Sequence, residues 1–222
     1  MSRPPRAGVP SRRDVHFDQL NTPATWDVLS KTGQSYFDAL VEHLTRRLGV
    51  RIAFVVEAVD PRGHRLCPVA VSGTDKFRGG RCYDAHGTPC ERIGRGASGI
   101  YPDRLAERFP LDGWLPATGM QSYVALAIQG QNGALLGHLG VLDDRPMEEP
   151  QAITATLDCF LARCRAELLR AREDRGLSRI TGRHAWALYR AAPPGLGAVL
   201  STPDGQGFLG YTTAELAEHE DL

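Results

Sequence analysis

The sequence has almost no lysine and no surplus of charge of either sign. Its 222 residues include 26 basic and 26 acidic side chains, and Lys31 and Lys76 are the only lysines. Nucleic-acid-binding domains usually carry a basic surplus or a basic stripe on one face. The balanced charge therefore argues against a nucleic-acid partner.

Long apolar runs are also missing. No stretch approaches the ~18 consecutive apolar residues of a membrane-spanning helix, and no apolar segment follows the arginines near the N-terminus. The cysteine count is odd, and without a secretory signal we expect reduced thiols. We therefore predict a cytoplasmic protein without a membrane span. The cysteines are Cys67, Cys82, Cys90, Cys159 and Cys164.

The two ends of the sequence differ from its middle. Residues 1–24 are rich in proline and arginine and have little apolar periodicity, which predicts a disordered arm. Residues 25–175 have the patterning of one folded domain. Residues 176–222 are expected to form a linker and a segment too short to bury much core alone.

The folded part opens with a predicted helix and a predicted hairpin. Apolar residues at spacings of three and four in 34–48 indicate an amphipathic helix, which Gly49 should end. The run 51–59 is typical of a buried strand, and the turn at 60–63 leads to a second strand over 66–71. These strands should pair antiparallel.

A second hairpin and a long helix are predicted near the end of the domain. Strands over 122–128 and 134–143 flank the turn residues Asn132-Gly133. Pro150 should open a helix of about 25 residues with one apolar seam. Such a seam suits packing on its own sheet and also a coiled coil with a second copy, so we expect a homodimer.

Residues 73–120 are rich in glycine and proline and show weak periodicity. A structureless loop of that length is unusual in a compact domain. Short elements are therefore predicted here: strands near 80–83 and 99–101, and helices near 89–93, 102–108 and 112–118. Partly ordered connections of this kind often carry binding sites.

Aromatic residues of this middle segment and of the following strand are candidates to line a ligand pocket. Small-ligand sites are mostly apolar with a few polar groups, although each of these rings suits core packing equally well. His138 in the last strand would orient a ligand if it points inward; the alternative is a hydrogen-bonded core or surface histidine. The aromatic candidates are Tyr83, Tyr101, Phe109, Trp114 and Tyr123.

Cys90 is the most informative single residue. It follows Pro89, where a helix should begin, and a helix N-terminus lowers the pKa of a thiol and raises its reactivity. That suits a redox or ligand-contacting role; the alternative is a small buried residue that packs on the sheet. Cys82, His86 and Cys90 are metal-ligand types, but Gly87 and Pro89 break the helix that would align them. We expect no metal site, and no cofactor can be named.

Helix, hairpin, irregular middle, hairpin and long helix follow one another in the order of the GAF fold of bacterial sensory proteins. Gly87-Thr88-Pro89-Cys90-Glu91 looks like the Gly-Thr-Pro-Cys element of one GAF subgroup, although Ala127-Ile128 stands where that subgroup has Pro-Leu. The resemblance spans about residues 33–175. It implies an α+β fold: an antiparallel sheet of five to six strands flanked by helices, with a long C-terminal helix. Further elements that recur in order are Tyr101-Pro102, Arg108-Phe109-Pro110, Gly119, Ser122-Tyr123, 136–143 and 160–168.

The C-terminal residues 192–197 and 209–212 resemble the opening motifs of a PAS domain. The segment between them is too short for a complete PAS domain, so the resemblance implies a truncated PAS-like segment. In these families, such modules precede outputs like histidine kinases and cyclases.

The resemblance implies a non-enzymatic sensory module that binds a small ligand or a partner and signals through its long C-terminal helix. Ligand contacts would fall on Tyr83, Cys90, Tyr101, Phe109, Tyr123 and His138. Expected partners are a small molecule, a second copy, and a signalling kinase or cyclase. Three alternatives stay open: a fragment of a sensor histidine kinase or diguanylate cyclase, a ligand-free scaffolding protein, and a free methionine sulfoxide reductase that uses Cys67, Cys82 and Cys90.

Overall fold

A computed structural model of the chain shows two compact units, Met1–Leu169 and Arg170–Leu222. None of the helices in the described part is long and apolar enough to cross a membrane. The structure describes residues 22–60, 62–74, 81–93, 98–181, 188–190 and 199–201.

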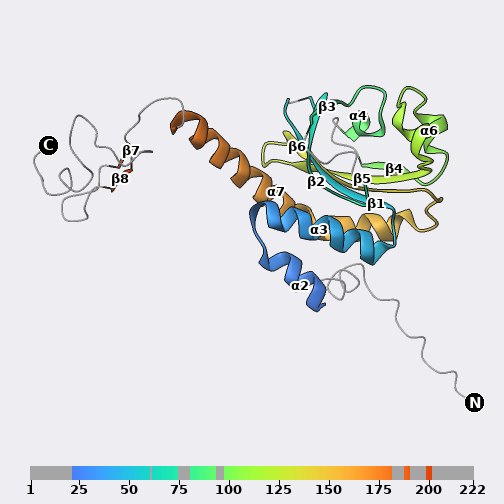
Figure 1. Ribbon diagram of the computed structural model, residues 1–222, viewed down its shortest axis with the longest axis horizontal. Helices are drawn as coiled ribbons and strands as arrows, with labels where there is room; N and C mark the ends of the chain where they lie inside the picture. The colour runs from blue at the N-terminus through green and yellow to red at the C-terminus, as the bar shows by residue number, and fades with distance from the viewer. Residues whose placement is uncertain are drawn as a thin grey trace, which may run out of the picture. The chain divides into compact units, whose positions relative to one another are not determined.

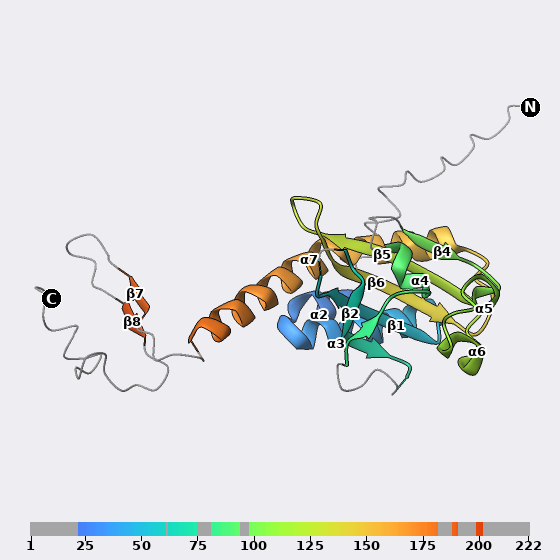
Figure 2. The same cartoon turned by 90° about the horizontal axis from the view of Figure 1, so that it is seen from above.

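The first unit is built on a six-stranded sheet in the order β3-β2-β1-β6-β5-β4, with every neighbouring pair antiparallel. Figure 2 shows the long strands β1, β6 and β5 side by side. The sheet and its flanking helices confirm the predicted α+β fold. The strands are β1 (Ile52–Ala58), β2 (Arg65–Ser72), β3 (Tyr83–Asp84), β4 (Gly99–Tyr101), β5 (Ser122–Gln129) and β6 (Leu135–Asp143).

Helices cover both faces of the sheet. Figure 1 shows α3 and the first part of α7 along one face, and α4 and α6 over the other. α2 packs on α3. The helices are α2 (Pro23–Ser30), α3 (Gly33–Leu48), α4 (Pro89–Ile93), α5 (Leu105–Arg108), α6 (Trp114–Thr118) and α7 (Pro150–Thr181).

Strand β1 is buried along its whole length, because it lies at the centre of the sheet with helices on both sides. Its side chains alternate between two cores. Ala53 and Val55 face a helix-side core, and Phe54 and Val56 face a cavity-side core. The helix-side core includes Tyr36, Leu40, Leu44, Ala53, Val55, Leu139, Val141, Leu157, Phe160, Cys164 and Leu168. The cavity-side core includes Ile52, Phe54, Val56, Leu66, Cys90, Ile93, Leu105, Phe109, Leu115, Tyr123 and Leu142.

The predicted elements of the domain are confirmed in type and order. Helix α3 ends at Gly49, whose φ of 62° is the left-handed conformation that glycine adopts easily. The short strands and helices of the middle segment also form, at β3, α4, β4, α5 and α6. Two elements differ from expectation: α2 was not predicted, and α7 has 32 residues instead of about 25.

Helix α2 has a local cause that the periodicity did not reveal. The Thr22 side chain accepts a hydrogen bond from the Thr25 N–H at 3.2 Å, and Pro23 occupies the first turn. Both are helix-starting features. Thr25 and Val28 are its buried residues, so packing supplies the rest of its stability.

The second unit contains the end of α7 and a two-stranded antiparallel sheet of β7 (Leu188–Arg190) and β8 (Val199–Ser201). The predicted PAS-like motifs at 192–197 and 209–212 lie outside the described residues, as do positions 1–21 of the predicted arm. The predicted domain limits stay predictions.

The expectation of five reduced thiols is wrong for two of them. Cys67 and Cys82 form a disulfide, whereas Cys90, Cys159 and Cys164 keep their thiols. The antiparallel pairing of Leu66 with Tyr83 brings their neighbours together across the β2–β3 edge. Because disulfides persist mainly in oxidising compartments, the cysteines give no support to the predicted cytoplasmic location.

Candidate functional site

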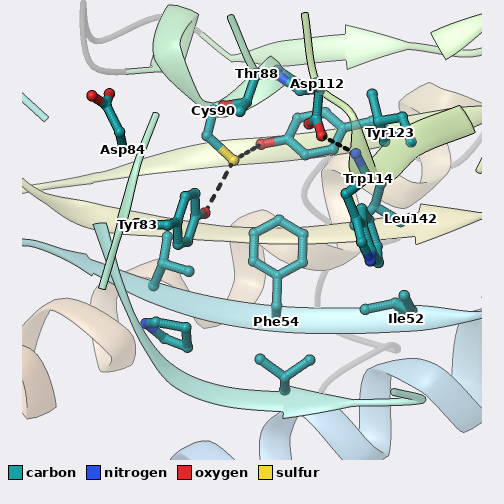
Figure 3. A pocket seen from close by; sticks show the side chains of 15 residues that line it. Ile52, Phe54, Tyr83, Asp84, Thr88, Cys90, Asp112, Trp114, Tyr123 and Leu142 are labelled. Carbon is teal, nitrogen blue, oxygen red and sulfur yellow. Dashed lines mark hydrogen bonds between the residues drawn. The ribbon is translucent and has the colours of Figure 1, made fainter. Parts of the chain in front are cut away.

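A cavity of about 290 Å³ lies on the face of the sheet opposite α3 and α7. Strands β1, β2, β5 and β6 supply its floor and walls, and the segments around α4 and α6 close over it (Figure 3). Most lining side chains are apolar, which is typical of a small-molecule site. The lining residues are Ile52, Phe54, Val56, Pro68, Val71, Tyr83, Asp84, Thr88, Pro89, Cys90, Asp112, Trp114, Leu115, Tyr123 and Leu142.

The floor of the cavity depends on a close approach between Phe54 and Gly140. These residues pair across β1 and β6, and Gly140 pairs with Ala125 on its other side. A Cβ added to Gly140 would lie 2.5 Å from the Phe54 Cζ and 2.7 Å from the Ala125 Cβ. The missing side chain therefore makes the room in which the Phe54 ring packs.

A tight turn positions Cys90 beside the cavity. The Asp84 carboxylate accepts a hydrogen bond from the His86 N–H at 2.8 Å, and the Glu91 carboxylate accepts one from the Gly87 N–H at 2.8 Å. The Thr88 hydroxyl donates to the Ala85 carbonyl at 2.6 Å. These bonds fix the Gly-Thr-Pro-Cys element and the start of α4, so that the sulfur of Cys90 lies within reach of two phenols.

Tyr83, Cys90 and Tyr123 form a polar cluster in this apolar setting. The Tyr83 hydroxyl donates to the Cys90 Sγ at 3.5 Å, and the Cys90 Sγ and the Tyr123 hydroxyl are 3.5 Å apart (Figure 3). Burial raises the pKa of both tyrosine hydroxyls well above the usual value. All three groups therefore stay protonated and neutral at physiological pH.

The pKa of Cys90 does not follow the interpretation of a thiol activated by a helix N-terminus. Burial raises the pKa of this thiol, and the hydrogen bonds to Tyr123, Tyr83 and Thr88 offset that rise only in part. Helix α4 has only five residues, and its N-terminus does not outweigh the loss of water around the sulfur. Cys90 matches the alternative of a small buried residue, with a sulfur at the cavity wall.

Three of the six predicted site residues line the cavity, namely Tyr83, Cys90 and Tyr123. Tyr101 and Phe109 lie behind Tyr123 instead. The Tyr101 ring contacts Phe109 at a centroid distance of 4.9 Å and Tyr123 at 6.0 Å. They support the cavity wall without forming its surface.

His138 also lies outside the lining, next to the floor. It is fully buried, and its ring meets Phe54 edge-to-face at a centroid distance of 5.8 Å. Neither ring nitrogen has a hydrogen-bond partner in the described part of the chain. Burial lowers its pKa to about 3, so the ring is neutral. His138 is therefore a core histidine, as the alternative expected, but without the expected hydrogen bond among the described residues.

Sequence reasoning missed Asp112 and Phe54 as lining residues. Asp112 lies two residues before α6, and its carboxylate accepts a hydrogen bond from the Trp114 N–H at 3.1 Å. Aspartate commonly bonds the backbone two residues further on in turns, so the sequence offered no separate signal for a site. Phe54 lies in a strand that is apolar throughout, which hides the face toward which each side chain points.

The potential metal ligands are separated in the structure. Cys82 is bonded to Cys67, and the exposed His86 lies 3.5 Å from the Glu91 carboxylate. Across the described ranges, no three His, Cys, Asp or Glu side chains are grouped so as to hold a metal ion.

Solved structures with the same arrangement are GAF domains. The GAF domain of an Acinetobacter phosphoenolpyruvate-protein phosphotransferase matches with a TM-score of 0.59 and 15% identity, over 73% of this chain and 98% of that chain. The chain has the GAF fold. The GAF domain of the corresponding Coxiella burnetii protein matches with a TM-score of 0.54 and 21% identity, over 72% of this chain and 96% of that chain.

A methyl-accepting chemotaxis protein also shares the fold, with a TM-score of 0.52, 19% identity, and coverage of 66% of this chain and 95% of that chain. No family model matches the sequence. No curated protein matches it either. The similarities therefore establish the architecture, and the residues of the cavity have to carry any functional conclusion.

Proposed function

We propose that this protein is a non-enzymatic sensory module whose cavity binds a small, mainly apolar molecule. The observation that carries the proposal is the cavity of about 290 Å³ with a neutral Tyr83–Cys90–Tyr123 cluster in its wall. Its size is at the lower end of ligand pockets, which span about 300–1,000 Å³. The likeness to a domain of a chemotaxis protein supports a sensory role.

The sheet offers a direct route from the cavity to α7. On β1, Phe54 faces the cavity and the adjacent Val55 faces the helix-side core. On β6, Leu142 and Val141 are divided in the same way, and the helix-side core also holds Leu157 of α7. A ligand that shifts β1 or β6 would therefore change the packing beneath α7, provided it binds two states of the domain with different affinities.

An ion pair with a buried carboxylate holds α7 near the junction of α2 and α3. The Glu167 carboxylate accepts hydrogen bonds from the Gly33 N–H at 2.7 Å and pairs with the Arg163 guanidinium at 2.8 Å. Arg163 also donates to the Lys31 carbonyl at 3.0 Å. Because Glu167 is almost fully buried, its contacts with Gly33 and Arg163 depend on the position of α7. A displacement of α7 would break them.

Output from the domain would pass through the end of α7. The buried seam of α7 is followed by a polar stretch over 170–176, and we propose that the helix continues into contacts with a second copy of the chain. A signalling kinase or cyclase would read the state of that helix. No catalytic residue is assigned, since the raised pKa of Cys90 disfavours the thiolate that reductase chemistry needs.

The test compares two phenylalanine substitutions. Val71→Phe puts a larger ring into the cavity wall, whereas Val59→Phe adds the same ring at a position that is 58% exposed. Native mass spectrometry of the purified protein should show a co-purifying small molecule in the wild type and Val59→Phe but not in Val71→Phe, and a dimer in all three. If a folded Val71→Phe variant retains the bound molecule, that molecule binds outside the cavity. A sample that contains only monomers would contradict the proposed homodimer.

A further inference from the structure

The ionisable side chains among the described residues that line the cavity are all acidic or weakly acidic. The lining contains Asp84 and Asp112 together with the hydroxyls and thiol of the Tyr83–Cys90–Tyr123 cluster, and no described lining residue is lysine, arginine or histidine. An anionic ligand buried here would find no counter-charge among these residues, and an unpaired buried charge is strongly disfavoured. The lining therefore selects against carboxylates, phosphates and nucleotides.

Of the two carboxylates, Asp112 is the one near the polar cluster. It lines the cavity together with Tyr83 and Cys90, and its negative charge contributes to the raised pKa of both groups. Asp84 instead turns back to bond the His86 N–H, and Figure 3 shows its carboxylate directed away from the Phe54 ring. Among the described residues no basic side chain forms an ion pair with Asp112, whose carboxylate accepts a hydrogen bond from the Trp114 N–H.

Besides Tyr123, three aromatic rings line the cavity that contains this carboxylate. Phe54, Tyr83 and Trp114 all line the cavity, and Figure 3 shows Tyr83 and Trp114 on opposite sides of Phe54. Aromatic faces attract cations, most strongly where water is excluded, and rings combined in this way recognise ammonium groups. A carboxylate and three rings in one cavity are complementary to a positive charge on an apolar body.

We infer that the cavity takes a small organic cation, an ammonium group on an aryl or alkyl body, with Asp112 as its counter-charge and Phe54, Tyr83 and Trp114 as its aromatic walls. This inference rests on the proposed function, since it names the class of ligand for the same cavity. The apolar body would lie against the Ile52 and Val71 side of the lining.

The first experiment compares three probes of similar size on the wild-type chain at pH 7 by titration calorimetry. They are 2-phenylethylamine, 2-phenylethanol and 3-phenylpropionate, which are cationic, neutral and anionic. We expect the amine to bind at least about tenfold more tightly than the alcohol, or about 1.4 kcal/mol, and the propionate to show no binding. Equal binding of amine and alcohol, or preferred binding of the propionate, overturns the cation while leaving a ligand-binding cavity in place.

The second experiment removes the charge of Asp112 without removing its structural bond. In Asp112→Asn the side-chain oxygen can still accept from the Trp114 N–H, so the start of α6 is retained. Glu148→Gln removes an exposed carboxylate elsewhere and serves as the control. We expect the preference for the amine to vanish in Asp112→Asn and to persist in Glu148→Gln.

A preference that survives in Asp112→Asn overturns the role of this carboxylate. If the amine produces no heat with the wild type, the inference fails whatever the variants do. The proposed function fails with it only if native mass spectrometry also finds no bound molecule that Val71→Phe displaces.

Discussion

The two faces of the sheet contain similar residue types in different surroundings. Each has a buried cysteine beside tyrosine: Cys164 lies 3.6 Å from the Tyr36 hydroxyl on the helix side, and Cys90 lies 3.5 Å from two phenols on the cavity side. The pair on the helix side is enclosed in the core under α7. The cluster on the other side borders a cavity of about 290 Å³.

The two faces therefore contribute differently to the stability of the fold. The long helices α3 and α7 fill the helix side, where Leu40, Leu44, Leu139 and Leu157 are fully inaccessible to solvent. Short elements cover the other side and leave space that side chains do not fill. A face that keeps a cavity gives up packing energy, and the filled face supplies the stability that makes this possible.

The largest expected effect is a contrast between two leucine truncations. Leu157→Ala removes a fully buried side chain from the helix-side core, and we expect it to lower the free energy of unfolding by about 3–5 kcal/mol. Leu142→Ala enlarges a cavity that already exists, and its cost should be about 2 kcal/mol, since its side chain has fewer packing partners to lose. Urea unfolding measures both values.

Circular dichroism before unfolding controls for loss of fold in either variant. An equal or larger cost for Leu142→Ala would show that the cavity-side core is packed as tightly as the helix-side core, and would remove the basis for the comparison.

Much of the helix side could be predicted from the sequence because its elements are long. The 3.6-residue periodicity of α3 and α7 and the turn at Asn132-Gly133 specify their elements locally. Even there, α2 was missed, because it spans only eight residues and depends on its Thr22 cap and on packing.

The cavity side could be predicted only in part. Tyr83, Cys90 and Tyr123 were expected at a pocket and do line it, but Tyr101 and Phe109 pack behind the wall. Whether an aromatic ring faces a cavity or supports it depends on the register and the packing of strands distant in sequence. Local pattern does not contain that information.

The disulfide beside the cavity is the second expected effect. The Cys67–Cys82 bond closes a loop with a sequence separation of 15 at the β2–β3 edge. For a loop of that size the chain-entropy model gives about 3 kcal/mol of stabilisation. We expect Cys67→Ser combined with Cys82→Ser to lower the unfolding free energy by up to about that amount, measured in urea.

Cys159→Ser is the matched control, because this cysteine keeps its thiol and lies on α7. If adding a reductant shifts the unfolding midpoint of the double variant as much as that of the wild type, the disulfide does not contribute this stability.

The smallest effect concerns the two buried histidines, His138 on the cavity side and His43 on the helix side. Burial lowers the pKa of His138 to about 3 in the folded state, against about 6.5 in the unfolded chain. The unfolded state therefore binds a proton first as the pH falls, and stability decreases between about pH 6.5 and pH 3. From pH 7 to pH 5 this group alone should cost about 2 kcal/mol.

Replacing each histidine by leucine tests whether the two faces differ in this respect. His138→Leu should flatten the loss of stability between pH 7 and pH 5, measured by urea unfolding at each pH. Burial and the charges of Arg47 and Arg46 also lower the pKa of His43, but this side chain is 6% exposed whereas His138 is fully buried. His43→Leu should therefore flatten the profile less. A wild-type slope that His138→Leu leaves unchanged would mean that this ring reaches water or a partner before the domain unfolds, which would open the floor of the cavity.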